Sequence, residues 1–495
     1  MSKSVIVIGS GFAGLSAATH LAHRGYRVRL LEKNSQNGGR ARSFSEAGFT
    51  FDMGPSWYWM PDVFEHYFKC FGKKVADYYK LERLDPSYRV YFGDQDYVDL
   101  PANLEELYQL FDSIEAGSGE KLRQFLGEAA YKYQVGINDL VYKPGRSLAE
   151  FADLRVLRGL LQLNLLQSMR SYVHKFFDND RLRQIMEFPI LFLGGTPKDT
   201  PALYSLMNYA DMALGTWYPE GGMVSIVKAM ESLAKEKGVE ILNNQEVTNL
   251  EVVKGTIVGV KTTTDYFESD VVVAGADYHF VEQNLLEKKY RQYSESYWQK
   301  RQMAPSSLLF YVGLDKEIDG ILHHTLCFDE SFDLHAQEIY DDPQWPSRPL
   351  FYLSAASKTD PNVAPGGHEN LMMLIPVAPG LTDDEQTRQR YFDLIMDRLE
   401  KLTGEEIRKH VVYQRSYAHR DFISDYNAFK GNAYGLANSL RQTAVLKPSM
   451  KSKKVKNLYY TGQLTVPGPG VPPSLISGEV VAGEIAKDIK NPVMA

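Results

Sequence analysis

The most informative stretch for the fold lies near the start of the chain and reads Val5-Ile6-Val7-Ile8-Gly9-Ser10-Gly11-Phe12-Ala13-Gly14. Its first four residues are β-branched, as expected for a strand that is buried on both faces. A helix rich in small residues follows and ends near Gly25, and a second strand runs over residues 28–31. This order is the βαβ unit of a dinucleotide-binding domain. The sequence therefore predicts an α/β fold that opens with a Rossmann-like parallel sheet.

The G-x-G-x-x-G spacing places three glycines where a dinucleotide site needs them. Gly9 makes the tight turn, Gly11 lets the backbone approach a pyrophosphate, and Gly14 lets the helix pack on the strand. The N-terminus of the helix offers unpaired N–H groups and its positive dipole end to phosphates. Glu32 ends the second strand, where a carboxylate accepts hydrogen bonds from ribose hydroxyls. The predicted contacts are Gly9, Ser10, Gly11, Phe12, Ala13, Gly14, Glu32 and Lys33.

A second glycine-rich element follows Glu32 directly. In Gly38-Gly39-Arg40-Ala41-Arg42, paired glycines precede an arginine whose guanidinium can reach phosphate oxygens. A turn followed by a surface arginine is the alternative interpretation. With this element the chain resembles the large flavoprotein group that includes amine oxidases and carotenoid desaturases. That resemblance implies FAD as the cofactor.

Three further segments narrow the resemblance. Residues 48–56 (GFTFDMGPS), 218–223 (YPEGGM) and 462–472 (GQLTVPGPGVP) occur in the order found in the phytoene desaturase family. The chain thus resembles a bacterial carotenoid desaturase, either a phytoene desaturase or a 3,4-desaturase of hydroxylated carotenoids. The resemblance implies a long apolar carotenoid substrate and non-covalent FAD. It adds these cofactor contacts: Gly39, Arg40, Gly54, Pro55, Ser56, Val247, Gly462, Gln463, Val471 and Pro472. For Val247, an ordinary strand valine is the alternative.

The whole chain has 495 residues, and this length indicates two or three domains. We expect the FAD-binding domain to combine residues 1–85, 226–300 and 451–495. A helical, membrane-facing substrate region is expected over residues 86–225 and an inserted mixed α+β substrate domain over 301–450. Helices are predicted over 223–237, 383–402 and 477–487, and short strands over 240–242, 247–253, 256–263 and 270–274.

Charge and metal-binding residues exclude several function classes. The 55 Lys and Arg residues against 62 Asp and Glu residues give a net charge of −7, which argues against nucleic-acid binding. Cys70 and Cys327 build neither a disulfide framework nor a four-cysteine metal site. His20 and His23 share one face of a helix that is expected to pack on the sheet. The adjacent residues His323 and His324 cannot easily point toward one ion. No metal-binding motif is present. We therefore predict no metal.

Residues 154–177 are the candidate for contact with a membrane. No apolar run reaches the roughly 18 residues of a spanning helix, and the N-terminus begins at once as a strand rather than a signal peptide. We therefore expect a cytoplasmic protein held peripherally at the inner face of the cell membrane. A basic amphipathic helix in an acidic chain suits an anionic surface, and a core helix with a solvated basic side is the alternative. Its apolar residues are Leu154, Leu157, Leu161, Leu165, Met169, Tyr172 and Phe176, and its charged ones Arg155, Arg158, Arg170 and Lys175.

The chemistry implied by the resemblance needs little from the protein's side chains. Desaturation removes two hydrogens from a C–C bond flanked by double bonds. The flavin takes one as hydride, and the delocalised cation then loses a proton without a strong base. We therefore assign no catalytic residue and interpret Asp52 and Glu220 as structural. No second G-x-G-x-x-G suits a nicotinamide, so the reduced flavin is expected to pass its electrons to oxygen or a quinone.

Two other function classes stay open on the sequence. A flavin amine oxidase would need an aromatic cage for a small amine beside the flavin, and a non-catalytic flavoprotein would need only the cofactor motifs. Two positions depart from the desaturase family. Val466 stands where many relatives have histidine, and Pro473 stands where they often have glycine. Both are expected beside the flavin ring, so they bear on substrate and regiochemistry rather than on the cofactor.

Overall fold

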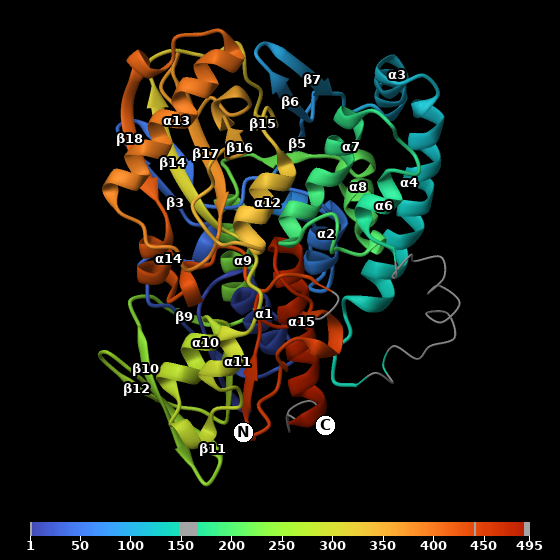
Figure 1. Ribbon diagram of the computed structural model, residues 1–495. Helices are drawn as coiled ribbons and strands as arrows, with labels where there is room; N and C mark the ends of the chain where they lie inside the picture. Colours follow the sequence, from blue (N-terminus) through green and yellow to red (C-terminus); the bar gives the residue numbers. More distant parts are fainter. Residues whose placement is uncertain (1, 148–149, 151–166, 440–441, 490–495) are drawn as a thin grey trace.

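The computed structural model describes residues 2–147, 150, 167–439 and 442–489 (Figure 1). A five-stranded sheet, in the order β19-β13-β1-β2-β9 and parallel throughout, forms its lower half. All five strands come from the three segments expected to form the cofactor domain. They are β1 (Ser4–Ile8), β2 (Arg27–Leu31), β9 (Glu240–Leu242), β13 (Val271–Ala274) and β19 (Leu458–Tyr460).

The central strand β1 sends alternate side chains into two different cores. Val5 and Val7 pack in the core shared with the helices α1 (Phe12–His23), α9 (Val224–Glu236) and α15 (Val471–Asp488). Ile6 and Ile8 pack in a core shared with a three-stranded antiparallel sheet. Helices therefore cover one face and a second sheet the other, which explains the run of apolar residues. The covering strands are β10 (Val247–Val253), β11 (Thr256–Thr262) and β12 (Tyr266–Glu268).

The upper half is built on a seven-stranded mixed sheet in the order β18-β14-β17-β16-β15-β6-β7 (Figure 1). Alternate residues of β14, Leu308 and Phe310, pack under α13 (Glu385–Thr403). The residues between them, Leu309 and Tyr311, face the core of the cofactor domain. The strands are β6 (Tyr88–Gly93), β7 (Asp96–Leu100), β14 (Ser306–Leu314), β15 (His324–Cys327), β16 (Phe351–Ser354), β17 (Glu369–Val377) and β18 (Val411–Tyr417).

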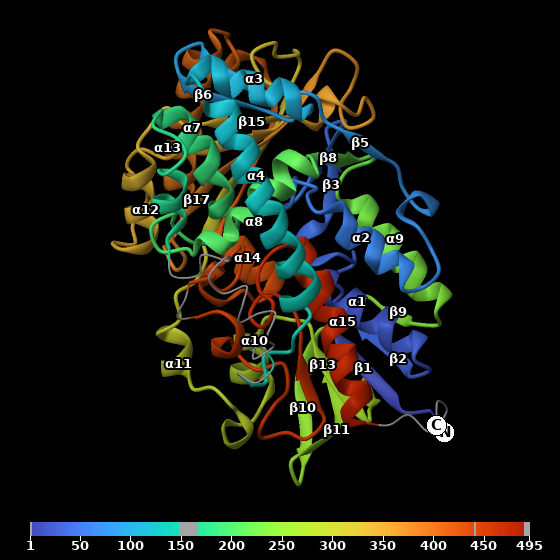
Figure 2. The same cartoon turned by 90° about the vertical axis from the view of Figure 1, so that its right-hand side faces the viewer.

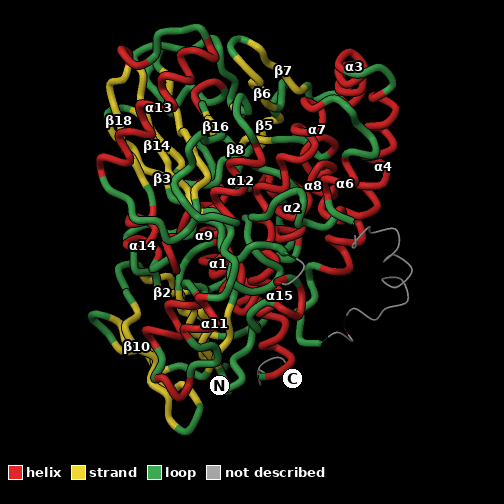
Figure 3. Tube along the Cα trace, in the orientation of Figure 1, coloured by secondary structure: helices red, strands yellow, loops and turns green. Residues whose placement is uncertain are grey.

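Shorter elements connect and flank these two halves, as the colouring by secondary structure shows (Figure 3). Two small antiparallel pairs are also present: the hairpin of β3 (Ser43–Glu46) and β4 (Phe49–Asp52), and the long-range pair of β5 (Leu81–Arg83) and β8 (Trp217–Pro219). Helices α10 (Tyr278–Phe280), α11 (Glu295–Gln299), α12 (Phe332–Tyr340) and α14 (His419–Tyr426) lie along the later half of the chain.

A helical region covers one side of the molecule (Figure 2). The range expected for it, residues 86–225, is wrong at its start, because β6 and β7 pair with the mixed sheet there. Within the described ranges, no helix has the length and apolar content to cross a bilayer. The main helices are α2 (Pro61–Lys69), α3 (Leu104–Ile114), α4 (Ser118–Val135), α6 (Met169–Val173), α7 (Asp180–Glu187) and α8 (Leu206–Asn208).

The expected membrane helix is only partly visible, because residues 151–166 lie outside the described residues. That gap includes Leu154, Arg155, Leu157, Arg158, Leu161 and Leu165. At its described end the expectation of one continuous helix is wrong, since extended Ser168 caps a short helix that starts at Met169. Met169 and Tyr172 are buried, and the Arg170 guanidinium pairs with Glu187 and Asp333. This end therefore fits the core-helix alternative.

Two boundaries differ from the sequence prediction for local reasons. Helix α15 begins at Val471 rather than at 477, with prolines in its first turn. Proline is favoured there because the first N–H groups of a helix have no partner inside it. Strand β13 begins at Val271, since the Asp270 carboxylate accepts hydrogen bonds from the Ser4 backbone N–H and hydroxyl.

Candidate functional site

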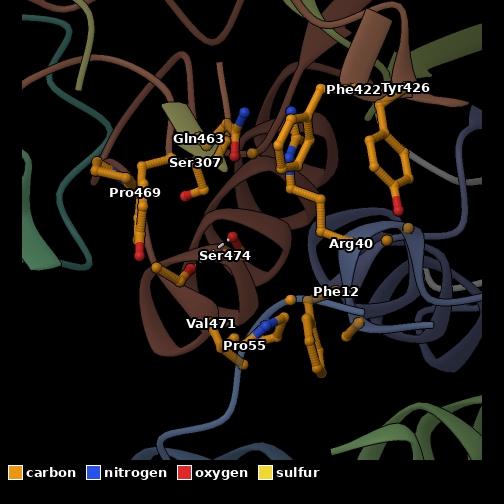
Figure 4. Close-up of a pocket in the computed structure, with 18 of the residues that line it drawn as sticks. Phe12, Arg40, Pro55, Ser307, Phe422, Tyr426, Gln463, Pro469, Val471 and Ser474 are labelled. Atoms are coloured by element: carbon orange, nitrogen blue, oxygen red, sulfur yellow. Dashed lines mark hydrogen bonds between the residues drawn. The ribbon is translucent and has the colours of Figure 1, made fainter. Parts of the chain in front are cut away.

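One large pocket joins the parallel sheet to the mixed sheet. It holds about 2730 Å³ of space free of protein atoms, open solvent at its mouth included. Its lining runs from the glycine motif at the start of α1 to apolar side chains of the mixed sheet, so one pocket extends from the dinucleotide motif into the upper half of the molecule. Figure 4 shows side chains from the N-terminal segment, from β14, from α14 and from the chain around the start of α15 converging on it.

The pocket gathers nearly all of the cofactor contacts predicted from sequence. Ser10 and Gly14 are the two that do not line it. That the other predicted residues bind FAD stays a prediction. FAD binding would require four separate segments of the chain to meet, and they meet at this pocket. The lining residues are Gly9, Gly11, Phe12, Ala13, Glu32, Lys33, Gly39, Arg40, Gly54, Pro55, Ser56, Val247, Gly462, Gln463, Val471 and Pro472.

The three glycines of the first motif have the roles that their spacing predicts. Gly9 has a φ of +92°, which is the left-handed turn that favours glycine. A Cβ on Gly14 would lie 1.9 Å from the Gly9 carbonyl oxygen, so only glycine lets α1 pack this close to β1. A Cβ on Gly11 would meet no atom within 4 Å. Gly11 also precedes α1 without a capping side chain. Open space and unpaired N–H groups together fit a pyrophosphate.

Ser10 has a different role from the predicted direct contact. Its backbone N–H and its hydroxyl donate to Glu32 Oε2 at 2.9 and 2.7 Å. The Asn34 N–H donates to Glu32 Oε1 at 2.9 Å. These bonds fix a buried carboxylate in the pocket wall, where it can accept from a ribose hydroxyl.

Arg40 is partly buried and its Nε is shielded from solvent, so it is not the surface arginine of the alternative interpretation. Its Nη2 donates to the Asn432 carbonyl at 3.0 Å, while its Nε makes no hydrogen bond to a described residue. The guanidinium lies 4.9 Å from the centre of the Tyr426 ring, and burial lowers its pKa. A buried cation with an unused donor requires an anion. Arg40 therefore fits an FAD phosphate.

We expect Arg40→Met to weaken FAD binding at least tenfold, about 1.4 kcal/mol. The apoprotein should be no less stable, because methionine fills similar space without an unpaired buried charge. Thermal unfolding with and without added FAD separates the two effects, since the rise in Tm on adding FAD should shrink in the variant. An apoprotein that loses stability while its affinity for FAD is unchanged would make Arg40 purely structural.

Asp52 and Glu220 have the structural roles that the sequence indicates. Asp52 Oδ2 accepts from the Met223 N–H at 2.8 Å and Oδ1 from the Val224 N–H at 3.3 Å. The carboxylate thereby joins two of the family-like segments at the start of α9, and burial raises its pKa to about 7. Glu220 forms an exposed ion pair with Lys80.

The N-terminus of α15 is the second helix end at the pocket. Val471, Pro473 and Ser474 line the pocket here, and Gly470 precedes them with no capping side chain. The positive end of this 18-residue helix therefore faces the cavity. Val466 does not line the pocket, contrary to expectation; it is buried, and its carbonyl accepts from the Ser477 hydroxyl at 2.9 Å.

The other half of the pocket is apolar. One face of α12 contributes Phe332, His335, Ala336 and Ile339 at helical spacing. His335 is neutral, because Nε2 donates to the Pro376 carbonyl and Nδ1 accepts from the Leu350 N–H, and burial lowers its pKa to about 4. Further apolar lining comes from the sheet and its neighbours: Leu309, Leu326, Phe328, Leu350, Phe351 and Leu374.

The acidic residues of the described lining all lie at the dinucleotide end. Glu246 adjoins Val247, Asp277 follows the Gly275-Ala276 turn that packs against Gly9, and Asp425 contacts Arg42. A small cation in the apolar half would therefore meet aromatic rings but no carboxylate. Sequence analysis missed Ser307, Phe422, Tyr426 and Tyr434 of the lining because no motif carries them.

A hydrogen-bonded cluster stands between the two halves of the pocket. The Tyr352 hydroxyl lies 2.8 Å from the Ser56 hydroxyl and 2.7 Å from His324 Nδ1. The Trp57 ring stacks on His324 at 4.0 Å between centres. Adjacent His323 turns the other way and contacts the Thr359 hydroxyl. This cluster fixes the pocket-lining Ser56 and Tyr352, and sequence analysis did not foresee it.

Comparison with known proteins agrees with this geometry. Residues 12–486 match the family described as flavin containing amine oxidoreductase. The chain is 43% identical to a carotenoid 3,4-desaturase of Haloarcula japonica, over 98% of this chain and 99% of that one. It is 31% identical to a zeta-carotene-forming phytoene desaturase of Myxococcus xanthus, over 97% and 93% of the two chains. An oxidoreductase structure from Methanosarcina mazei shares the fold, with a TM-score of 0.61 at 16% identity, over 97% and 100%.

Proposed function

Because the chain belongs to the carotenoid desaturases of the phytoene desaturase family, and so is a flavin-dependent oxidoreductase of carotenoid biosynthesis, we propose that it desaturates its substrate at C-3,4. The substrate proposed is a carotenoid with a hydroxylated acyclic end, or a monocyclic, hydroxylated γ-carotene-type carotenoid. The relative named as a carotenoid 3,4-desaturase supports this choice, since it is 43% identical, against 31% for the relative named as a phytoene desaturase. Phytoene is the second candidate substrate.

The cofactor we propose is non-covalent FAD. Gly11 and the N-terminus of α1 would hold the pyrophosphate together with Arg40, and Glu32 would hold the ribose. When bound, FAD supplies the hydride acceptor of the desaturation. The described lining contains one histidine, His335, whose ring nitrogens are both engaged, and no cysteine. No cysteine and no free histidine of this lining is therefore available for a covalent flavin bond, and acid precipitation should leave all flavin in the supernatant.

The protein's own contribution is to orient a polyene and exclude water. Apolar side chains of α12 and the mixed sheet would take the place of water around the C–H bonds of the polyene. The positive end of α15 favours negative charge at the cofactor end of the pocket. We assign no side chain as base, because Asp52 caps α9 and the pocket's acids lie at the dinucleotide end.

One observation carries this proposal: a single pocket has a dinucleotide half and an apolar half without a carboxylate. A flavin amine oxidase would bind a cationic amine, and the described lining of this chamber contains aromatic rings but no carboxylate to balance the charge of the amine. A carotenoid has no charge to satisfy and suits the same chamber.

The test is an anaerobic mixing experiment with the FAD-loaded enzyme. A hydroxylated γ-carotene-type substrate in liposomes should bleach the flavin absorbance while a carotenoid with longer-wavelength absorption appears. Chromatography then distinguishes a 3,4-desaturated product from products of phytoene. Flavin bleaching by a simple amine, with no reaction of either carotenoid, would replace this proposal with amine oxidation.

We further propose a peripheral position at the inner membrane face and oxygen or a quinone as the electron acceptor. An apolar substrate and a quinone both reside in lipid, so access to a bilayer serves both. Arg155→Gln with Arg158→Gln should weaken binding to anionic vesicles by about 1 kcal/mol per charge. Arg170 is left unchanged, because its ion pairs stabilise the fold. Sedimentation with vesicles measures the loss, and equal binding by the parent and the double variant would contradict the surface role.

A further inference from the structure

A cluster of metal-ligating side chains lies apart from the pocket, between three helices. The helices α1, α2 and α15 lie side by side, as both views show (Figures 1 and 2). His20 comes from α1, His66 from α2, Cys70 directly follows α2, and Glu479 comes from α15. One ligand atom each of His20, Cys70 and Glu479 lie within 4.8 Å of one another.

The fold brings these residues together by close helix packing. A Cβ on Gly478 would lie 2.5 Å from Ser16 Cβ and 2.6 Å from the Ala13 carbonyl, so glycine lets α15 approach α1 there. Glu479 follows at once and reaches the next turn of α1, where His20 lies. His66 and Cys70 stand four residues apart, which places them on one face.

The distances suit a common ion. His66 Nε2 lies 3.2 Å from Glu479 Oε2 and 3.6 Å from Cys70 Sγ. His20 Nε2 lies 3.9 Å from Glu479 Oε2. Ligands at zinc–ligand distances of about 2.0–2.3 Å in a tetrahedron are separated by roughly 3.3–3.8 Å. His20, Cys70 and Glu479 already meet within 4.8 Å of one another, and His66 adjoins two of them, so the four side chains must draw closer together to share one ion.

His20 is the group that a simple hydrogen-bonded cluster leaves unexplained. Its side chain is 3% exposed, and Nε2 makes no hydrogen bond to any residue within the described ranges. Its ring is held against Tyr67 and Phe71, and its Nε2 lies on the side of Glu479. An unpaired buried nitrogen is unfavourable, and a bound ion would give it a partner.

We propose that His20, His66, Cys70 and Glu479 form a binding site for one Zn²⁺ ion. Thiolate, imidazole and carboxylate together suit Zn²⁺ better than Mg²⁺ or Ca²⁺, which prefer oxygen ligands alone. Binding releases the Cys70 thiol proton to solvent as the zinc–sulfur bond forms. The ion enters from the surface, where the His66 side chain is 47% exposed. Sequence analysis predicted no metal because it considered His20 only with its neighbour His23.

The site would act on the cofactor indirectly. Glu479 lies eight residues beyond Val471, about 12 Å along α15, so the ion is remote from the flavin position. It would link the three helices behind the pocket, two of which present their N-termini to the cofactor. We therefore expect Zn²⁺ to raise the thermal stability of the FAD-loaded protein rather than to take part in redox chemistry.

The experiment uses the tag-free, FAD-loaded full chain, stripped with a chelator and then equilibrated with Zn²⁺. Elemental analysis should find one zinc per chain, and zinc X-ray absorption should show one sulfur ligand at about 2.3 Å. Cys70→Ser and His66→Gln should each lower zinc affinity at least tenfold while keeping FAD content and circular dichroism. His410→Gln is the matched control, because His410 pairs with one carboxylate, Asp315, at 2.7 Å. Zinc binding that survives Cys70→Ser, or a shell without sulfur, would overturn the proposal.

Discussion

Gly11→Val is expected to give a folded protein that retains no FAD through purification. In the ligand-free chain a Cβ at this position meets no atom within 4 Å, so we expect the fold to tolerate the branched side chain. A pyrophosphate at the start of α1 would occupy that same space, and two added methyl groups would displace it. We expect at least a hundredfold loss of affinity, about 2.7 kcal/mol. Flavin absorbance per chain after purification and FAD titration of the apoprotein measure it.

Two companion variants make this result specific. Gly127→Val adds the same side chain to an exposed helical glycine whose Cβ also meets nothing, and it should keep its flavin. Gly14→Val should instead damage the fold, because its Cβ would lie 1.9 Å from the Gly9 carbonyl oxygen. A Gly11 variant that binds FAD like the parent would remove the pyrophosphate from this turn and, with it, the cofactor assignment.

The contrast between Gly11 and Gly14 shows what a local motif can predict. The spacing of the motif predicts a different role for each glycine, because the tight turn from strand to helix determines which glycine faces the ligand and which faces the strand. Asp52 could also be interpreted as structural from its neighbours in sequence. Ser10 could not, since the partner of its side chain, Glu32, is defined only once β1 and β2 pair in parallel register.

Residues that meet through tertiary packing left no signal in the sequence. Phe422 and Tyr426 line the pocket because α14 folds back onto the N-terminal segment, and no motif marks them. The His20–Glu479 contact joins residues at opposite ends of the chain and depends on Gly478 as a point of close helix approach. The expected helix over residues 154–177 failed at Ser168, where apolar spacing continues but the serine side chain caps a new helix.

Ala336→Trp should abolish carotenoid conversion while leaving FAD in place. Ala336 lies on the face of α12 that lines the apolar half of the pocket, together with Phe332 and Ile339. Indole at this position would fill space that a long polyene needs, and a rigid chain that cannot thread past it cannot reach the flavin. We expect at least a tenfold lower rate of flavin reduction by carotenoid under anaerobic conditions, with the flavin content per chain unchanged.

Gln337→Trp is the matched control, because the next residue of α12 is exposed. This variant carries the same indole on the solvent side, and the carotenoid should reduce its flavin at the parental rate. If both variants react normally, the substrate does not enter between α12 and the mixed sheet, and the apolar half of the pocket has another use. If both lose FAD, the helix itself has moved, and a smaller change such as Ala336→Leu separates steric block from misfolding. Selective loss in Ala336→Trp alone would locate the polyene, since only a ligand on this face of α12 distinguishes two neighbouring positions of one helix.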